Sequence, residues 1–179
     1  MSQISAELSH LADLDELSGS AAASVLAAAG WSRERRNPTK SWATTWRRGD
    51  AHAWIQGDGP VAVEFTLWFR EVEEEARADL DTFMDGLYAA AEAELTEVVA
   101  DLSSGDFGER LQATGDNVAD VDDFIQYRAW RVAGRELVAG VRQSDTDTPV
   151  MIAVVLREPA VRAEPTPGRL TFPSNERAL

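Results

Sequence analysis

The chain has 179 residues, of which 44% are hydrophobic and 27% charged, and its formal net charge is −14. This composition is typical of one folded domain with a substantial core and argues against a disordered chain. The absence of cysteine excludes disulfide bonds and thiolate metal sites. The sequence has no run of about 18 apolar residues, and its acidic start lacks the pattern of a signal peptide. We therefore expect a soluble, cytoplasmic protein that does not enter a membrane.

Charge is distributed unevenly along the sequence. Six of the 17 basic residues fall between residues 33 and 48, a stretch with a single acid, whereas residues 71–101 hold eleven acids and one arginine. A strongly acidic protein repels nucleic acid and anionic membranes at long range, and it attracts basic partners. The charge pattern makes nucleic acid an unlikely partner.

The N-terminal region predicts two helices. Leucines recur every three residues at positions 8, 11, 14 and 17, and the helical stretch extends from about Ser5 to Ala29. Ser18-Gly19-Ser20 is expected to interrupt it, because serine caps helix N-termini well. Gly30 suits the left-handed position that ends a helix.

Three strands are predicted next, at Ser41–Arg48, Ala51–Gln56 and Val61–Arg70. In the third, apolar residues occupy every second position from Val61 to Phe69. This alternation is typical of an antiparallel sheet with one buried side.

The strongest periodicity predicts a long helix from about Val72 to Leu102. Its apolar residues recur at steps of three and four: Ala76, Leu80, Phe83, Leu87, Ala91, Leu95, Val98 and Leu102. A helix of that length would extend about 45 Å, more than a typical strand of the sheet beneath it covers. Part of it is therefore expected to overhang the sheet or to meet a partner.

The remaining chain predicts a loop, three more strands and a tail. Ser103–Asp123 is expected to form a loop around one short helix, followed by strands at Phe124–Val132, Arg135–Gln143 and Val150–Arg157. The last strand is almost uniformly apolar, which indicates a central position. The overall prediction is an α+β domain over residues 1–158, with an antiparallel sheet of five to six strands packed on one face by the long helix and the N-terminal helical segment. Residues 159–179 are rich in proline and are expected to form an extended or disordered tail.

The sequence contains no recognisable catalytic or metal-binding motif. His10 and His52 lie on different predicted elements, and the acidic run at residues 116–123 lacks the ligand spacing of a calcium loop. The glycines at 57 and 59 precede a strand rather than a helix, so they predict a turn and not a nucleotide-binding loop. We expect no metal, no cofactor and no enzymatic activity. An enzyme site built from scattered carboxylates remains an alternative.

One cluster of side chains between residues 31 and 54 is a candidate binding surface. Four tryptophans alternate there with basic residues, which is compatible with a buried core fringed by arginines, with a protein interface, or with stacking on single-stranded nucleic acid. The candidate partner-binding residues of this segment are Arg35, Arg36, Trp42, Trp46, Arg47 and Arg48. The acidic candidates on the long helix are Glu73, Glu74, Asp81 and Asp85.

Over residues 5–157, the predicted elements follow one another as a helical segment, three strands, a long helix and further strands. This order and the acidic charge resemble those of the small chaperone-like domains of type III secretion. That resemblance implies an α+β fold, often dimeric, that holds a polypeptide partner without catalysis. A third strand after the long helix and the proline-rich tail depart from the pattern. The composition is also similar to that of small acidic actinobacterial proteins, among which immunity factors neutralise basic toxins. The expected function is therefore a non-enzymatic protein-binding module, chaperone-like or immunity-like, with a basic protein partner and a homodimer both compatible with the sequence.

Overall fold

A computed structural model describes residues 4–58, 60–72, 79–114, 118, 121, 123–145 and 148–159. Its helices are α1 (Ser5–Ala12), α2 (Gly19–Ala28), α3 (Leu80–Leu102) and α4 (Gly105–Glu109). Its strands are β1 (Ser32–Arg36), β2 (Ala43–Arg48), β3 (Ala51–Gln56), β4 (Ala62–Arg70), β5 (Gln112–Ala113), β6 (Phe124–Val132), β7 (Arg135–Arg142) and β8 (Val150–Arg157). The predicted α+β class and the break between two N-terminal helices are confirmed.

The strands form one antiparallel sheet of eight strands in the order β1-β2-β3-β4-β8-β7-β6-β5. The expected number of five to six strands is therefore wrong. The two missed strands lie at the sheet edges, where apolar alternation is not needed. β1 has the sequence Ser-Arg-Glu-Arg-Arg and is exposed at every position, and β5 has only two residues. Neither sequence carries a strand signal.

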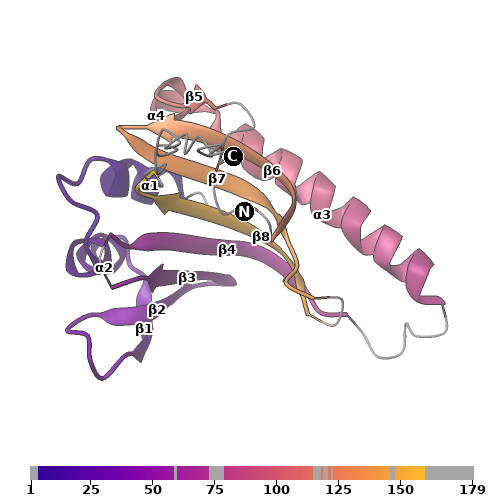
Figure 1. Cartoon of the computed structure of the whole chain (residues 1–179), viewed down its shortest axis with the longest axis horizontal. Coiled ribbons are helices and arrows are strands. Elements are labelled where there is room, and N and C mark those ends of the chain that lie inside the picture. The colour runs from indigo at the N-terminus through magenta and orange to yellow at the C-terminus, as the bar shows by residue number, and fades with distance from the viewer. Residues whose placement is uncertain are drawn as a thin grey trace, which may run out of the picture.

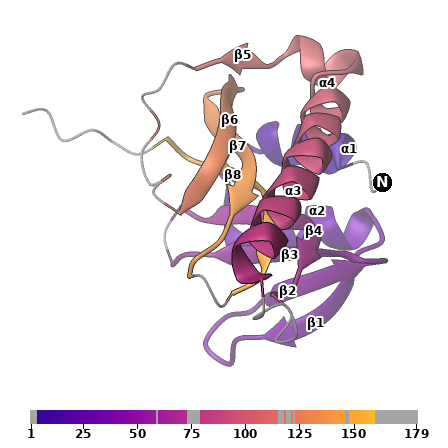
Figure 2. The same ribbon diagram turned by 90° about the vertical axis from the view of Figure 1, so that its right-hand side faces the viewer.

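The helices pack on a single face of this sheet. Cross-strand partners Ala53, Phe65, Val154 and Ala139 mark that face from β3 through β4 and β8 to β7, and all four are buried. Helix α2 packs on β2 and β3, α1 contacts β8, and α3 lies along β7 and β8 (Figures 1 and 2). One continuous apolar cluster joins these helices to the sheet. The predicted packing of a long helix and an N-terminal helical segment on one face is present.

Helix α3 begins later than the sequence suggests. It extends for 23 residues from Leu80 to Leu102, about 34 Å, and residues 73–78 of the predicted helix lie outside the described part of the chain. Its buried stripe consists of Leu87, Ala91, Leu95, Val98 and Leu102. In contrast, Leu80 in the first turn is 42% exposed. The fully buried side chains of α3 therefore lie in its C-terminal two thirds, and Phe83 and Met84 near its start pack against the core while partly buried.

The position of β8 agrees with its apolar sequence. It pairs with β4 on one side and with β7 on the other, and seven of its eight residues are apolar. The predicted turn between β6 and β7 is also present, with positive φ at Ala133 (48°) and Gly134 (81°). Two successive left-handed residues match the type I′ turn that joins tightly paired antiparallel strands.

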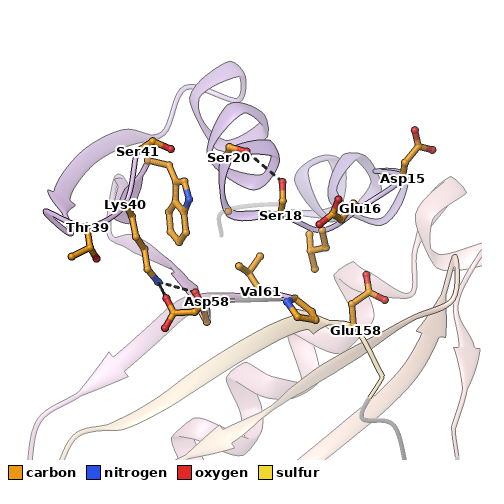
Figure 3. Close-up of a pocket in the computed structure, with 15 residues that line it drawn as sticks. Asp15, Glu16, Ser18, Ser20, Thr39, Lys40, Ser41, Asp58, Val61 and Glu158 are labelled. Atoms are coloured by element: carbon orange, nitrogen blue, oxygen red, sulfur yellow. Dashed lines mark hydrogen bonds and ion pairs between the residues drawn. The ribbon is translucent and has the colours of Figure 1, made fainter.

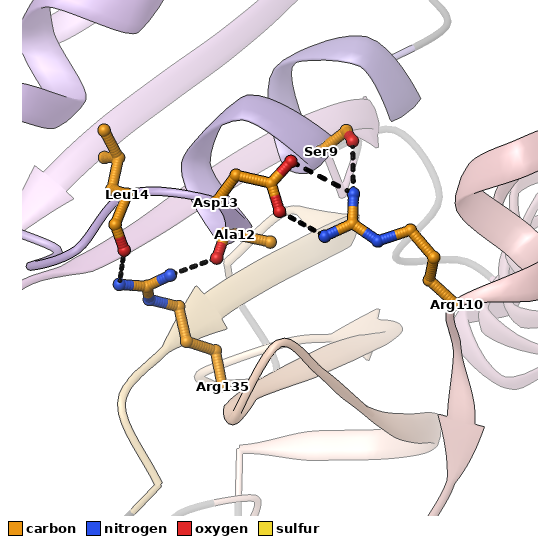
Figure 4. Close-up of polar contacts among 6 residues, drawn as sticks. All are labelled: Ser9, Ala12, Asp13, Leu14, Arg110 and Arg135. Carbon is orange, nitrogen blue, oxygen red and sulfur yellow. Dashed lines mark hydrogen bonds and ion pairs between the residues drawn. The ribbon is translucent and has the colours of Figure 1, made fainter.

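Two arginines from the second half of the chain hold the end of α1 (Figure 4). Arg135, which is 4% exposed, donates hydrogen bonds to the carbonyls of Ala12 and Leu14, the latter at 2.6 Å. Arg110 pairs with Asp13 and donates to the Ser9 hydroxyl at 2.6 Å. The bond from Arg135 to Ala12 satisfies a carbonyl that the last turn of α1 leaves without a partner within the helix. Together these contacts fix the residues that lead from α1 into α2.

None of the helices in the described ranges has both the length and the apolar character needed to cross a bilayer. The predicted tail lies almost wholly outside these ranges, which end at Pro159.

Two Leu→Ala substitutions on α3 test this packing. Leu95→Ala removes a side chain that is 3% exposed, whereas Leu80→Ala makes the same chemical change at the 42% exposed position. We expect Leu95→Ala to lower the free energy of unfolding by about 2–4 kcal/mol and Leu80→Ala to change it by less than about 1 kcal/mol. Urea denaturation followed by circular dichroism measures both. Equal effects of the two substitutions would contradict the burial pattern of α3.

Candidate functional site

The tryptophans of the candidate segment divide between the core and the surface. Trp31 is 4% exposed and packs edge-on against Phe65 at 5.5 Å between ring centroids, and Trp46 is fully buried. Trp42 and Trp54 are half-buried. Trp46 is thus a core residue and not a surface contact. A row of exposed tryptophans that could stack on nucleic-acid bases is absent from β1 to β3.

Arg48 is occupied by a structural contact. Its guanidinium pairs with the Glu7 carboxylate, whose side chain is 3% exposed, and lies over the Trp31 ring at 4.7 Å from the centroid. The Trp31 indole N–H donates to the same carboxylate at 3.2 Å. This cluster joins α1 to β2, so Arg48 stabilises the fold.

The other predicted contact residues form two separate groups. Arg35, Arg36 and Arg47 are exposed on β1 and β2 at one edge of the sheet. Asp81 and Asp85 are exposed at the start of α3, which packs on β7 and β8, several strands away from β1. Glu73 and Glu74 lie outside the described residues. Among the candidates that the structure describes, the basic and acidic residues therefore do not share one site.

Among the described residues, three carboxylates are buried, and each has an arginine partner. Besides Glu7, Glu64 accepts from Arg142 at 2.9 Å, and Glu136 accepts from Arg157 at 2.7 Å. The Glu64 and Glu136 pairs lie on β4, β7 and β8, whereas the Glu7 pair joins α1 to β2. Within the described ranges, no three His, Asp or Glu side chains are close enough to hold a metal ion.

A polar concavity of the described surface lies where three connections meet. The α1–α2 connection, the β1–β2 connection and the β3–β4 turn enclose about 820 Å³ (Figure 3). Its charged lining consists of Asp15, Glu16, Lys40, Asp58 and Glu158. We call this the acidic pocket, because four carboxylates face a single ammonium group. Figure 3 shows Lys40 and Asp58 on one side and Asp15, Glu16 and Glu158 on the other.

Lys40 and Trp42 build one wall of the acidic pocket. Lys40 is the only lysine of the chain. Its ammonium pairs with Asp58 at 3.0 Å, donates to the Gly57 carbonyl at 2.7 Å and lies 4.8 Å from the centroid of the Trp42 ring. The aliphatic part of Lys40 is covered, and its side chain is only 17% exposed. Lys40 thus neutralises Asp58 and orders the aromatic wall.

The carboxylates on the opposite wall have few cationic partners among the described residues. Asp15 and Glu16 are exposed, and no ion pair joins either of them to another described residue. Both precede α2, whose N-terminus carries a partial positive charge that stabilises nearby acids by up to about 1 kcal/mol. That effect is small, and Ser18 already caps the helix by accepting a hydrogen bond from the Ala21 N–H at 3.3 Å. The negative charges of Asp15 and Glu16 therefore remain available to attract cations.

The floor of the acidic pocket is fixed from below. The Val61 N–H donates to the Leu17 carbonyl at 3.3 Å, which joins the α1–α2 connection to the start of β4. Arg135, whose hydrogen bonds hold Leu14, also pairs with Glu158 at 3.1 Å. These contacts anchor the pocket to the sheet, and its aromatic wall and carboxylates suit an ammonium or guanidinium group.

Sequence reasoning identified Trp42 but missed the other pocket residues. Asp15, Glu16 and Asp58 lie in turns and carry no motif, and only the fold brings residues 15–20, 39–42, 57–61 and 158 together. The one local feature of the sequence that sets a pocket residue apart is that Lys40 is the single lysine among 17 basic residues.

Comparisons with protein-family models, with curated proteins and with solved structures found no match for this chain. The resemblance to chaperone-like domains therefore stays a prediction.

Substitution of Arg48 tests its structural assignment. Arg48→Met leaves Glu7 buried without its cationic partner, and we expect the free energy of unfolding to fall by about 2 kcal/mol, less than for a fully buried pair because Arg48 is 30% exposed. In the Arg48→Met background, Glu7→Gln should restore part of this loss, because it removes the uncompensated charge. A double-mutant cycle by urea denaturation measures the coupling. Additive effects would show that the two residues do not interact.

Gly19 tests the packing of Trp42. A Cβ at Gly19 would lie 2.1 Å from the Trp42 ring, so Gly19→Ala forces the indole out of its position. We expect a loss of about 1–3 kcal/mol in the native background. In a Trp42→Ala background, the same change should be neutral or stabilising, because alanine favours helices over glycine. The same sign in both backgrounds, measured by thermal denaturation, would contradict the contact.

Proposed function

We propose that this protein is a non-enzymatic protein-binding module, chaperone-like or immunity-like in role, that binds a basic segment of a protein partner at the acidic pocket. The observation that carries this proposal is the pocket itself, with about 820 Å³ of open space. Two of its four carboxylates, Asp58 and Glu158, pair with Lys40 and Arg135, and the other two, Asp15 and Glu16, are exposed. An arginine or lysine side chain of the partner can enter between Trp42 and the pair Asp15 and Glu16. There it gains charge-assisted hydrogen bonds to the carboxylates.

The net charge supports the same class of partner. At −14, the protein accelerates its encounter with a basic surface and discourages encounters with acidic ones. Exposed charge pairs at a rim contribute modestly to affinity and strongly to association rate. A salt-sensitive complex is therefore expected.

The alternatives have weaker support. An enzyme built from buried acids needs carboxylates that converge on a cavity, but Glu7, Glu64 and Glu136 are each paired with a different arginine. Nucleic-acid binding through residues 31–54 needs exposed tryptophans, but Trp31 and Trp46 are buried. Binding of a basic protein segment needs only exposed carboxylates, and it requires neither converging buried acids nor exposed tryptophans.

Charge removal at the acidic pocket tests the proposal. The probe is the capped peptide Gly-Arg-Gly-Arg-Gly, whose affinity is measured by isothermal titration calorimetry at low and high salt. We expect the double substitution Asp15→Asn and Glu16→Gln to weaken binding about tenfold at low salt, since each exposed pair contributes up to about 1 kcal/mol. At about 1 M salt the difference should disappear, because charges are then screened beyond about 3 Å.

The matched control is Asp106→Asn with Glu109→Gln on α4. Both residues are exposed, and the pair removes the same charge from a helix that does not line the pocket. The control should retain the native affinity within about twofold, since it changes only the long-range field. Equal weakening by both double substitutions would mean that net charge alone attracts the peptide, which would refute the pocket as the binding site.

A further inference from the structure

A cation already occupies one wall of the acidic pocket, and it is the chain's own Lys40. Its ammonium pairs with the Asp58 carboxylate at 3.0 Å, donates to the Gly57 carbonyl at 2.7 Å and lies over the Trp42 ring at 4.8 Å from the centroid (Figure 3). A carboxylate, a carbonyl and an aromatic face are groups that bind alkylammonium ions in proteins. We call these three groups the Lys40 subsite.

Of the two side chains that meet in this subsite, Trp42 is held more firmly than Lys40. The indole packs so closely on α2 that a Cβ at Gly19 would lie 2.1 Å from its Cε2 and Cζ2 atoms. The backbone of Lys40 is also fixed, because its N–H donates to the Asn37 carbonyl at 3.0 Å. The Lys40 ammonium, in contrast, is carried on a flexible four-carbon stem. It can therefore leave the indole while the backbone stays in place.

The polar contacts that hold the Lys40 ammonium lie at the surface. The Asp58 side chain is 93% exposed, so water and salt screen its attraction for the ammonium. Gly57, whose carbonyl is the other acceptor, is exposed as well. An ammonium that leaves this position regains hydration and loses little. A cationic segment that makes the same contacts and also reaches Asp15 and Glu16 has two further carboxylates to bind.

We propose that Lys40 is a built-in competitor for the partner, in that a lysine or arginine side chain of the partner displaces the Lys40 ammonium and takes its place on Trp42 and Asp58. This inference rests on the proposed function, because it names the groups of the acidic pocket that the partner's cation contacts. Since Lys40 is tethered, its effective concentration at its own subsite is high. Its presence therefore lowers the affinity of the acidic pocket for every cationic ligand.

Lys40 can be followed directly, because it is the only lysine of the chain. In protein made with lysine that is labelled with carbon-13 at Cε, a single residue gives the signal, and the unlabelled Gly-Arg-Gly-Arg-Gly peptide adds none. In the unliganded protein, we expect the ring current of Trp42 to shift the Lys40 Hε protons upfield of their position in free lysine. At saturating peptide, these protons should return to the free-lysine position.

Substitution of Lys40 tests the competition through the affinity for the same peptide, measured by isothermal titration calorimetry at low salt. Lys40→Met keeps an unbranched apolar side chain beside Trp42 but removes the ammonium. We expect it to bind the peptide about three- to tenfold more tightly, because the subsite is then unoccupied. Lys40→Arg retains a cation on a long stem and should stay within about twofold of the native affinity.

The matched control for charge is Arg128→Met. Arg128 is an exposed residue of β6 that does not line the acidic pocket, and its substitution removes the same single positive charge. The control should bind the peptide within about twofold of the native chain, since it changes only the long-range field.

Three results would overturn this inference and leave the proposed function to its own experiment. The first is a Lys40 signal at the free-lysine position without peptide, and the second is a signal that stays upfield at saturation. The third is a Lys40→Met variant that binds no more tightly than Arg128→Met. If the native chain binds no peptide, the same variant decides. Binding by Lys40→Met alone supports the built-in competitor, and absence of binding in both chains refutes both proposals.

Discussion

The buried guanidinium of Arg135 is the contact on which the geometry of the acidic pocket depends. Arg135 begins β7, yet it holds the end of α1 through the carbonyls of Ala12 and Leu14 and pairs with Glu158 after β8. Few donors could replace it, because buried carbonyls require partners and a guanidinium offers five N–H groups in a fixed plane. Together with the Val61–Leu17 hydrogen bond and the Arg110–Asp13 pair, Arg135 sets the position of Asp15 and Glu16.

The protein uses its charges in two ways. Arginines make the buried or half-buried pairs, with Glu7, Glu64 and Glu136 as their partners, because the planar guanidinium serves two acceptors at once. The exposed acids, in contrast, gather around the acidic pocket and along α3, where described basic partners are few. This division is the physical reason to expect recognition of basic segments. The buried pairs stabilise the fold, and the uncompensated acids remain at the surface for a partner.

Much of the fold was predictable because its signals are local. The period of α3, the alternation in β4 and the uniformly apolar β8 each follow from burial on the sheet, and the turn at Ala133-Gly134 follows from its glycine. The edge strands were missed because an exposed strand such as β1 needs no apolar residue. The acidic pocket was missed for a different reason. Asp15, Lys40, Asp58 and Glu158 are distant in sequence, and only the sheet order and the Arg135 contacts bring them together. The candidate binding residues were also limited by what local sequence can show. The alternation of tryptophan and arginine does not reveal that Trp46 faces the core.

The indole N–H signals of the six tryptophans can report whether the acidic pocket binds cationic side chains. During an NMR titration with the Gly-Arg-Gly-Arg-Gly peptide, we expect a saturating shift of the Trp42 indole signal and no shift for the buried Trp31 and Trp46. An unmoved Trp42 signal at saturation, or equal small shifts of all six indoles, would contradict binding at the acidic pocket.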